Sequence, residues 1–423
     1  MAMSTGELLR VEGGDLGPLQ AGREALELHI RPLTVFIGEQ GTGKSLLSQL
    51  LYFFRDAEYL LARYGGQSDP DTAVRAVVEG IRSGDSTNRA LASFLKPGEV
   101  ARISYIQGAA LASERRRVIS IRQKDRKISP LKPFNQEVED WLRAWFADPS
   151  QRPQFAQALF IPAERSFFSR FVNTDPGMLG HKVLPLTMRE FSRALTEAGR
   201  IFQEWQRVGG TMPSQARVIE GIVEPALRGK VRYSQLGRFA GRWQWIPEGT
   251  EQPIEIEMAS SGQMEAWPLV LVAQTLWGLP EPARPVYLHL EEPETHLHPA
   301  AQWALVKILA YLVNQGFHVT LTTHSLTVLY VLNNLMLASE LKTGDNQPFL
   351  KPEVPAPELR LAPAQVEAYF FARDGRVRSL LDREEGFISE AELGRVGEEL
   401  SYEMNLIGAL RWQLQQAADN AGG

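Results

Sequence analysis

One short segment constrains the fold of this chain more than any other part of its sequence. It matches the pattern G-x-x-x-x-G-K-[ST] and reads Gly38-Glu39-Gln40-Gly41-Thr42-Gly43-Lys44-Ser45. Its glycines let backbone N–H groups turn inward around phosphate oxygens, and a following helix adds the positive end of its dipole. Lys44 is placed to neutralise the outer phosphates, and the Ser45 hydroxyl is placed to bind Mg²⁺. The segment predicts an ATP site with magnesium.

The residues on both sides have the pattern that such a loop requires. Two short strands are predicted at 25–30 and 33–37, before the loop. After it, apolar residues recur with helical spacing at Leu46, Leu47, Leu50, Leu51 and Phe54. Strand, glycine turn and helix are the opening of an α/β nucleotide-binding fold, so we expect ATP contacts to extend to Leu46.

The α/β pattern is then interrupted and returns later. Residues 1–57 are predicted to hold the first part of the ATPase core, and 251–340 the second part. Residues 58–250 contain alternating segments and short helical segments, which predict an inserted antiparallel β lobe and a helical insertion. Residues 341–423 are expected to add strands and a helix that pack on the core, with a hairpin at 366–381 that turns at Asp374-Gly375 and a small-residue tail at 417–423. No heptad pattern runs for several repeats, so long coiled-coil arms are not expected.

Composition excludes several kinds of site. The chain has no cysteine, which removes disulfides, zinc hooks, thiol nucleophiles and iron–sulfur clusters. Its net charge of -5 means that a nucleic-acid surface would have to be a local patch. No apolar stretch reaches the roughly 18 residues that span a bilayer, and the start lacks a signal-peptide pattern. We therefore expect a cytoplasmic protein without a membrane partner.

A second motif is an apolar strand, 286–290, that ends in two carboxylates, Glu291 and Glu292. In this Walker B arrangement the first carboxylate orients the metal ion, and the second polarises the attacking water in phosphoryl transfer. The residue on the metal side is usually Asp. The longer side chain of Glu291 can still reach the metal ion, so we keep this role for it. The alternative is a strand that simply ends in solvated acids.

Two further segments have both a structural and a functional interpretation. Residues 259–263 open a helix, where Ser and Gly commonly serve as an N-cap. They also lie one helix before Glu291. His324 stands at the end of the strand that follows the Walker B strand, where it would face the phosphate end of a parallel sheet. The alternative for His324 is a hydrogen-bonded core histidine.

The order of these motifs resembles the ABC-type ATPases of the RecF/SMC/OLD branch. The resemblance covers about residues 25–60 and 255–330, and its most specific string is Glu291-Glu292-Pro293-Glu294-Thr295-His296-Leu297-His298-Pro299. Transporter ATPases generally carry Asp-Glu and a leucine-led signature instead. The resemblance implies an α/β P-loop fold of the ABC-ATPase type and an ATP hydrolase.

The resemblance also implies roles for individual residues. The signature motif, which contacts the γ-phosphate bound in the opposite subunit, would be Ser260, Ser261, Gly262 and Gln263. The D-loop, which crosses the dimer interface, would include Glu294, His296 and His298. His324 would be the switch histidine and would act with Lys44 and Glu292 in catalysis. The active unit of the family is two heads with two ATP molecules between them, so a second copy of the chain is the expected partner.

Two regions are harder to interpret. Pro162-Ala163-Glu164-Arg165 resembles a P-A-E-R segment of OLD-like ATPases, which makes Glu164 and Arg165 candidates for the Q-loop. Gln107 is the competing candidate. A basic segment could bind DNA or a partner protein, or could be a solvated face; it contains Arg115, Arg116, Arg117, Arg122 and Lys124. A second one, at 228–245, has aromatic residues between its basic residues, so it could contact phosphates and stack bases, or could also be a solvated face.

Four functions remain open at this stage. The first is a dimeric ATP-driven switch that controls a separate nuclease or toxin effector, as standalone OLD-like ATPases do in prokaryotic anti-phage defence. The second is a RecF-like repair or recombination ATPase that binds DNA directly. A transporter subunit is disfavoured by the 213 residues between Gly43 and Glu257. A non-hydrolysing scaffold is disfavoured by the presence of Lys44, Glu292 and His324. The residues after Ser325 contain no D-x-D pair, so no Toprim nuclease domain is expected.

Overall fold

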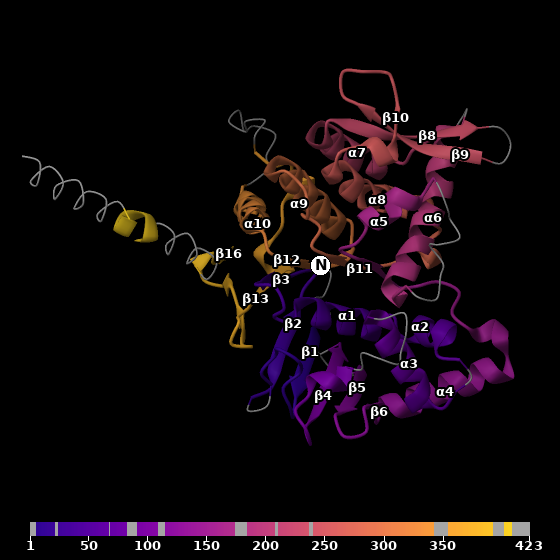
Figure 1. Cartoon of the computed structure of the whole chain (residues 1–423), viewed down its shortest axis with the longest axis vertical. Coiled ribbons are helices and arrows are strands. Elements are labelled where there is room, and N and C mark those ends of the chain that lie inside the picture. Colours follow the sequence, from indigo (N-terminus) through magenta and orange to yellow (C-terminus); the bar gives the residue numbers. More distant parts are fainter. Residues whose placement is uncertain are drawn as a thin grey trace, which may run out of the picture.

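The computed structural model describes residues 6–21, 24–66, 68–82, 91–108, 115–173, 184–207, 210–236, 240–341, 354–391 and 402–407. A central sheet lies between an antiparallel β lobe and a group of helices (Figure 1). This arrangement confirms the expected α/β class with an antiparallel β lobe and a helical insertion.

The central sheet has six strands in the order β14-β13-β3-β12-β11-β7. Five of them run parallel and β14 is antiparallel to β13. In that order, the strands are Val377–Ser379, Val366–Phe371, Leu33–Gly38, His318–Thr323, Tyr287–Glu291 and Ala158–Ile161. Because parallel strands end at the same edge, the P-loop, the Glu291-Glu292 pair and His324 all leave the sheet at one edge.

Strand β3 illustrates why this sheet is buried on both faces. Val35 and Ile37 belong to one hydrophobic cluster, which includes residues of α8 (Ser261–Thr275), α9 and α10. Phe36, between them, belongs to a second cluster with residues of α1 (Lys44–Arg55) and the β lobe. Helices α9 and α10 span Pro299–Asn314 and Leu326–Ser339. The continuous apolar pattern of β3 is typical of a strand covered on both sides.

The β lobe is a five-stranded antiparallel sheet in the order β2-β1-β4-β5-β6. These strands are Leu26–Ile30, Glu7–Glu12, Val100–Gln107, Arg115–Arg122 and Lys127–Leu131. Three helices complete this part of the chain: α2 (Ala57–Tyr64), α3 (Pro70–Arg82) and α4 (Phe134–Ala147). The lobe places the end of α3 and the short helix Leu91–Phe94 close to the P-loop.

The helical insertion lies on the other side of the central sheet from the β lobe (Figure 1). It consists of α5 (Ser166–Phe171), α6 (Leu186–Gln206) and α7 (Ser214–Leu227), followed by strands β8 (Gly229–Leu236), β9 (Ala240–Pro247) and β10 (Ile254–Glu255). Trp243 and Trp245 of β9 are buried in the core. They are therefore not free to stack on bases, which corrects the interpretation of this basic segment as an aromatic nucleic-acid surface. Arg238 and Phe239 lie outside the described residues.

The strands predicted at 25–30, 33–37 and 286–290 are β2, β3 and β11, and their ends differ from the prediction by at most one residue. The hairpin expected at 366–381 is β13 and β14, and the turn between them contains Asp374 and Gly375. The terminal helix is described only at 402–407, and the small-residue tail at 417–423 lies outside the described residues. Within the described part of the chain, no helix combines the length and the apolar character needed to cross a bilayer.

Candidate nucleotide site

The P-loop contains three glycines whose backbone conformation other residues rarely adopt. Gly38, Gly41 and Gly43 have φ values of 143°, 76° and 98°, all in the region that favours glycine. A Cβ on Gly43 would also lie 2.8 Å from Cγ of Leu19. The Thr42 hydroxyl donates to the Glu39 carbonyl over 2.8 Å and closes the turn. The loop leads directly into the start of α1, where a phosphate would bind.

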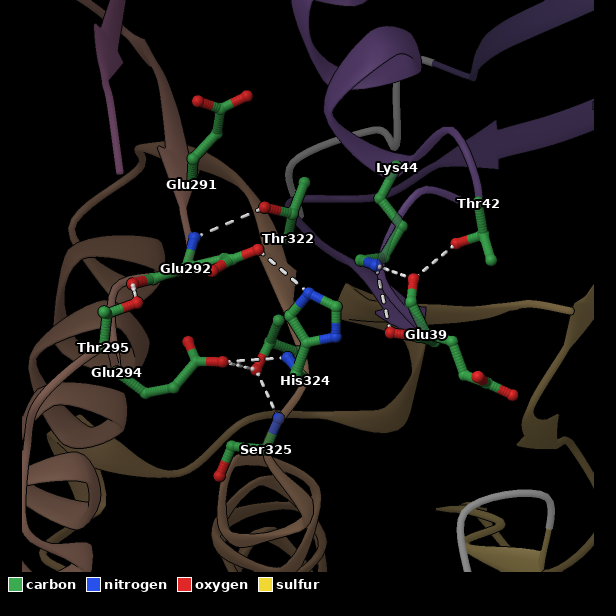
Figure 2. Close-up of polar contacts among 12 residues, drawn as sticks. Glu39, Thr42, Lys44, Glu291, Glu292, Glu294, Thr295, Thr322, His324 and Ser325 are labelled. Carbon is green, nitrogen blue, oxygen red and sulfur yellow. Dashed lines mark hydrogen bonds and ion pairs between the residues drawn. The ribbon is translucent and has the colours of Figure 1, made fainter. Parts of the chain in front are cut away.

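Lys44 lies under this loop and is 4% exposed. Its Nζ donates to the carbonyl oxygens of Gly38 (3.0 Å) and Glu39 (2.6 Å) (Figure 2). Burial lowers the pKa of Lys44 to about 8, while the carboxylates of Glu292, Glu294 and Glu39 act in the opposite direction. The ammonium group is thus held by carbonyl dipoles and has no direct ion pair among the described residues, which leaves its charge available to an anionic ligand.

A pocket of about 390 Å³ opens above the loop. Its P-loop lining is Gln40, Gly41, Thr42, Gly43, Lys44, Ser45 and Leu46, and Glu292 and His324 line the opposite side. Three further lining residues, which sequence reasoning missed, are Pro18, Arg82 and Phe94. The Arg82 guanidinium carbon lies 5.7 Å from the centre of the Phe94 ring. The volume is within the range of small-ligand sites.

Glu291 ends β11 and is 7% exposed. Its Oε1 accepts from Nε2 of Gln49 over 3.0 Å, and it also hydrogen-bonds with Ser45. Burial raises the pKa of this carboxyl to about 7, and the nearby Glu164 carboxylate adds to the rise. The Ser45 hydroxyl and a carboxylate at its side form the hard oxygen donor set that Mg²⁺ prefers, so these two residues fit a magnesium ion between them and a nucleotide.

Glu292, the next residue, is oriented differently from Glu291 (Figure 2). Its Oε1 lies 2.9 Å from Nε2 of His324. This hydrogen bond is the main reason that the pKa of Glu292 is lowered from its usual value, and the charges of Lys44 and Arg165 lower it further. Glu292 has a φ of 41°, a left-handed conformation that costs on the order of 1–3 kcal/mol for a residue with a side chain. Such strain is often found where a catalytic side chain has to point in one direction.

Glu294 fixes the other side of His324. Its Oε1 accepts from the Thr323 hydroxyl (2.5 Å) and from the His324 backbone N–H (2.8 Å) (Figure 2). Two residues on, His296 is exposed and has a φ of 60°. His298 is exposed at the N-cap of α9, where its Nδ1 accepts from the Ala300 N–H over 3.3 Å.

Residues 260–263 form the N-terminal end of α8. The Ser260 side chain accepts from the Gln263 N–H (3.3 Å), and the Gln263 side chain accepts from the Ser260 N–H (3.0 Å). The N-cap interpretation of this segment is therefore correct, as a capping box. Ser260 and Ser261 are exposed, and Gly262 packs so closely on His296 that a Cβ would lie 2.9 Å from the His296 carbonyl oxygen. None of the residues 260–263 lines the described P-loop pocket.

The P-A-E-R segment follows β7. Glu164 is exposed and close enough to Glu291 to affect its pKa. Arg165 is fully buried and donates to the carbonyls of both Glu291 and Glu292. Gln107 instead hydrogen-bonds to the Tyr287 hydroxyl over 3.2 Å and does not line the P-loop pocket. Of the two Q-loop candidates, only the P-A-E-R segment contacts the Walker B strand end.

The basic segment on β5 is not one exposed patch. Arg117 is 6% exposed, donates to the Phe54 carbonyl over 2.5 Å and pairs with Glu137 over 3.0 Å. Arg115 pairs with the same Glu137. Arg116 donates to the Ser104 hydroxyl. Arg117 therefore belongs to the structural core, which corrects its inclusion in a DNA or partner surface. Arg122 and Lys124 are exposed at the turn between β5 and β6.

Comparisons with known proteins support an ATPase fold. A family model described as "AAA ATPase domain" matches residues 186–329, about a third of the chain. Among solved structures, an SMC head bound to the C-winged helix domain of ScpA is similar, with a TM-score of 0.50 and 14% identity. The similarity covers 90% of this chain and 99% of that one. The fold is that of an SMC-type ATPase head.

A second SMC head, with an extended coiled coil and bound to the C-terminal domain of ScpA, is derived from Pyrococcus furiosus. It has a TM-score of 0.46 and 13% identity, over 94% of this chain and 100% of that one. No curated protein matches the chain in sequence. The matched ATPase domain begins at α6 and ends within α10, so it includes residues 260–263, Glu291, Glu292 and His324 but not the P-loop.

Proposed function

We propose that this protein hydrolyses ATP and acts as a switch, with each nucleotide site completed by a second copy of the chain. One observation carries the proposal. Lys44, Glu292 and His324 line one pocket, whereas the signature-like residues 260–263 lie outside it. A site with a phosphate cradle, a carboxylate and a histidine has the groups for hydrolysis but lacks the second set of phosphate contacts.

Within one copy, each residue has a definite role. The P-loop N–H groups and Lys44 hold the β- and γ-phosphates, and Ser45 and Glu291 hold Mg²⁺. When bound, the ion neutralises charge that develops on the phosphate oxygens. Glu292, kept ionised by its 2.9 Å contact with His324, orients and polarises the attacking water. His324 then lies beside the γ-phosphate and responds to its presence.

The nucleotide base has a candidate position at the rim of the same pocket. Phe94 is 45% exposed there, beside Pro18 and the exposed Arg82. An aromatic ring and a guanidinium plane are both surfaces on which a base stacks. We therefore place the adenine near Phe94 and the triphosphate along the P-loop.

The surface for the second copy would be formed by the signature-like and D-loop-like segments. Ser260, Ser261, His296 and His298 are all exposed, and the Gly262–His296 contact brings the two segments together. In a head-to-head dimer these polar groups would reach the phosphates held by the partner's P-loop. ATP would then favour the closed dimer and hydrolysis would open it.

The output of the switch is proposed to be a separate effector, such as a nuclease or toxin, in anti-phage defence. The SMC heads of similar fold were solved with a protein partner bound, which supports a protein output. The second candidate is direct DNA engagement, as in RecF-like repair. The exposed Arg122 and Lys124 at the β5–β6 turn favour it, although Arg117 and Arg115 are occupied by Glu137.

A mixing experiment tests the shared site. Lys44→Ala removes the phosphate contact of one copy, and Ser261→Arg blocks the signature-like segment of another. Each variant alone should be inactive. In an equal mixture, about half of the dimers contain one copy of each variant. One of the two sites in each such dimer is intact, so activity should return to about a quarter of the wild-type level. A mixture as inactive as its components would contradict a site built from two copies.

A further inference from the structure

The segment between β7 and α5 contains a buried cation whose contacts the proposed reaction does not use. Arg165 is 0% exposed. Its Nε donates to the Glu265 carbonyl (3.1 Å), its Nη1 to the Pro162 carbonyl (3.1 Å) and the Glu291 carbonyl (2.9 Å), and its Nη2 to the Glu292 carbonyl (3.0 Å). One planar group therefore joins the exit of β7, the helix α8 and the end of β11.

Two of these contacts help to fix the backbone of Glu292. The Glu291 carbonyl belongs to the peptide group before the Cα of Glu292, and the Glu292 carbonyl belongs to the peptide group after it. The orientations of these two peptide planes define φ and ψ of Glu292. Arg165 holds both planes. The first plane is also fixed from the other side, where the Glu292 N–H donates to the Thr322 carbonyl over 2.9 Å. The second plane is also held by Thr295, whose N–H (3.1 Å) and hydroxyl (2.8 Å) both donate to the Glu292 carbonyl.

This restraint acts on a residue in an unfavourable conformation. The φ of 41° at Glu292 persists only if its surroundings impose it. The same φ directs the Glu292 carboxylate to its 2.9 Å contact with His324. Loss of the two guanidinium contacts would leave the Glu292 carbonyl with its Thr295 donors alone, and the backbone would have more freedom to turn the carboxylate away from the pocket.

We propose that Arg165 is a positioning residue: by binding the carbonyls of Glu291 and Glu292 it sets the backbone that aims the Glu292 carboxylate at the attacking water. This inference rests on the proposed ATPase function and deepens it. The Nε contact with Glu265 ties the same guanidinium to α8, which begins with the signature-like segment. A shift of α8 on closure with a partner is thereby passed to the backbone of Glu292.

Arginine is the residue type that this role needs. Its guanidinium presents five N–H donors in a rigid plane, whereas lysine presents a point charge on a flexible stem. Burial lowers the pKa of Arg165, and four carboxylates, those of Glu265, Glu294, Glu292 and Glu291, act in the opposite direction. Arg165→Lys therefore retains a positive charge among these acids and removes only the planar set of donors. Arg165→Met removes both.

The experiment compares these variants with Arg284→Lys as a matched control. Arg284 also donates to main-chain carbonyls, those of Leu276 (3.0 Å) and Leu279 (3.2 Å), but beyond the far end of α8. The first readout is the single-turnover rate constant of ATP hydrolysis with protein in excess, which does not depend on the folded fraction. The second is the dissociation constant for Mg-ATP. The third is the amide exchange of the segment 290–296, measured without nucleotide.

For Arg165→Lys we expect the single-turnover rate constant to fall at least tenfold while the Mg-ATP dissociation constant stays within about threefold, because a misplaced catalytic group costs up to about 100-fold in rate. Exchange in 290–296 should rise in both Arg165 variants and stay unchanged in Arg284→Lys. A wild-type rate together with unchanged exchange in Arg165→Lys overturns the inference. If the wild type itself does not hydrolyse ATP, the ATPase proposal fails, and the exchange data still decide whether Arg165 fixes Glu292.

Discussion

The Glu292 carboxylate and the His324 imidazole are 2.9 Å apart, although 31 residues separate them in the chain. The contact exists because β11 and β12 are adjacent parallel strands, which pair Glu291 with Thr322 and release both side chains at one edge. The backbone of each residue is also hydrogen-bonded: the Glu292 carbonyl accepts from Arg165, and the His324 N–H donates to Glu294. The pair faces Lys44 across the pocket, which is the arrangement on which the proposed chemistry depends.

Replacing Glu292 by glutamine should separate binding from hydrolysis. Glu292→Gln keeps the size of the side chain but removes the base, so the hydrolysis rate should fall by about 10²–10⁴-fold. Mg-ATP binding should be retained, because Lys44 and the P-loop are untouched. Steady-state phosphate release and equilibrium binding measure the two effects. Glu281→Gln, at an exposed site on another segment, is the control and should hydrolyse at the wild-type rate.

The pKa of Lys44 predicts a pH dependence of nucleotide binding. Only the protonated amine attracts phosphate, and its pKa in the free protein is lowered to about 8. Affinity for Mg-ATP should therefore fall as the pH rises through 8, by up to tenfold per pH unit. Lys44→Arg stays charged over this range and should lose the dependence. Equal pH profiles for the wild type and Lys44→Arg would argue against this role for Lys44.

Gly262→Ala tests the contact between the signature-like and D-loop-like segments. The added Cβ would lie 2.9 Å from the His296 carbonyl, so one of the two segments has to move. We expect ATP hydrolysis to fall by at least tenfold with little change in ATP binding to a single copy, because the segment lies outside the pocket of its own chain. Gly221→Ala, on α7, has open space around its Cβ and serves as the control. Normal turnover in Gly262→Ala would show that this contact is not needed.

Arg117 and Arg122 lie on one strand but should respond differently to replacement. Arg117→Ala would leave Glu137 with the exposed Arg115 alone and would remove the bond to the Phe54 carbonyl, so a loss of about 3–5 kcal/mol in unfolding free energy is expected. Arg122→Ala, at an exposed site, should change it by less than about 0.5 kcal/mol. Chemical denaturation measures both. Of these two variants, only Arg122→Ala can therefore be used to test DNA binding without a loss of stability.

The sequence predicted the core of the fold well because its signals are local. The P-loop, the strand ending in Glu291 and Glu292, and α9 each have a continuous pattern that one segment contains. The contacts that the sequence did not reveal link distant segments. Phe94 and Arg82 reach the P-loop pocket only because the β lobe folds over α1. Their local sequence contains nothing that indicates a nucleotide.

One misjudged arginine, Arg117, had a signal in the sequence that could have been used. In β5, Arg117 shares one face of the strand with Ile119 and Ile121, both fully buried, so the alternation already placed Arg117 toward the core. Arg165 follows the buried strand β7. The sequence around a single arginine in this position does not indicate whether its side chain contacts a nucleotide or main-chain carbonyls. Arg165 contacts main-chain carbonyls because β11 runs beside β7, and this pairing is visible only in the structure.

The central claim, an ATP site shared by two copies, is tested most directly by the mass of Glu292→Gln in solution with and without Mg-ATP. Slowed hydrolysis should trap the closed state, so we predict a monomer without nucleotide and a dimer of twice the 47.3 kDa chain mass with it. Lys44→Ala combined with Glu292→Gln should remain a monomer in both conditions. A mass that does not change with Mg-ATP, at concentrations where binding is saturated, would contradict the account.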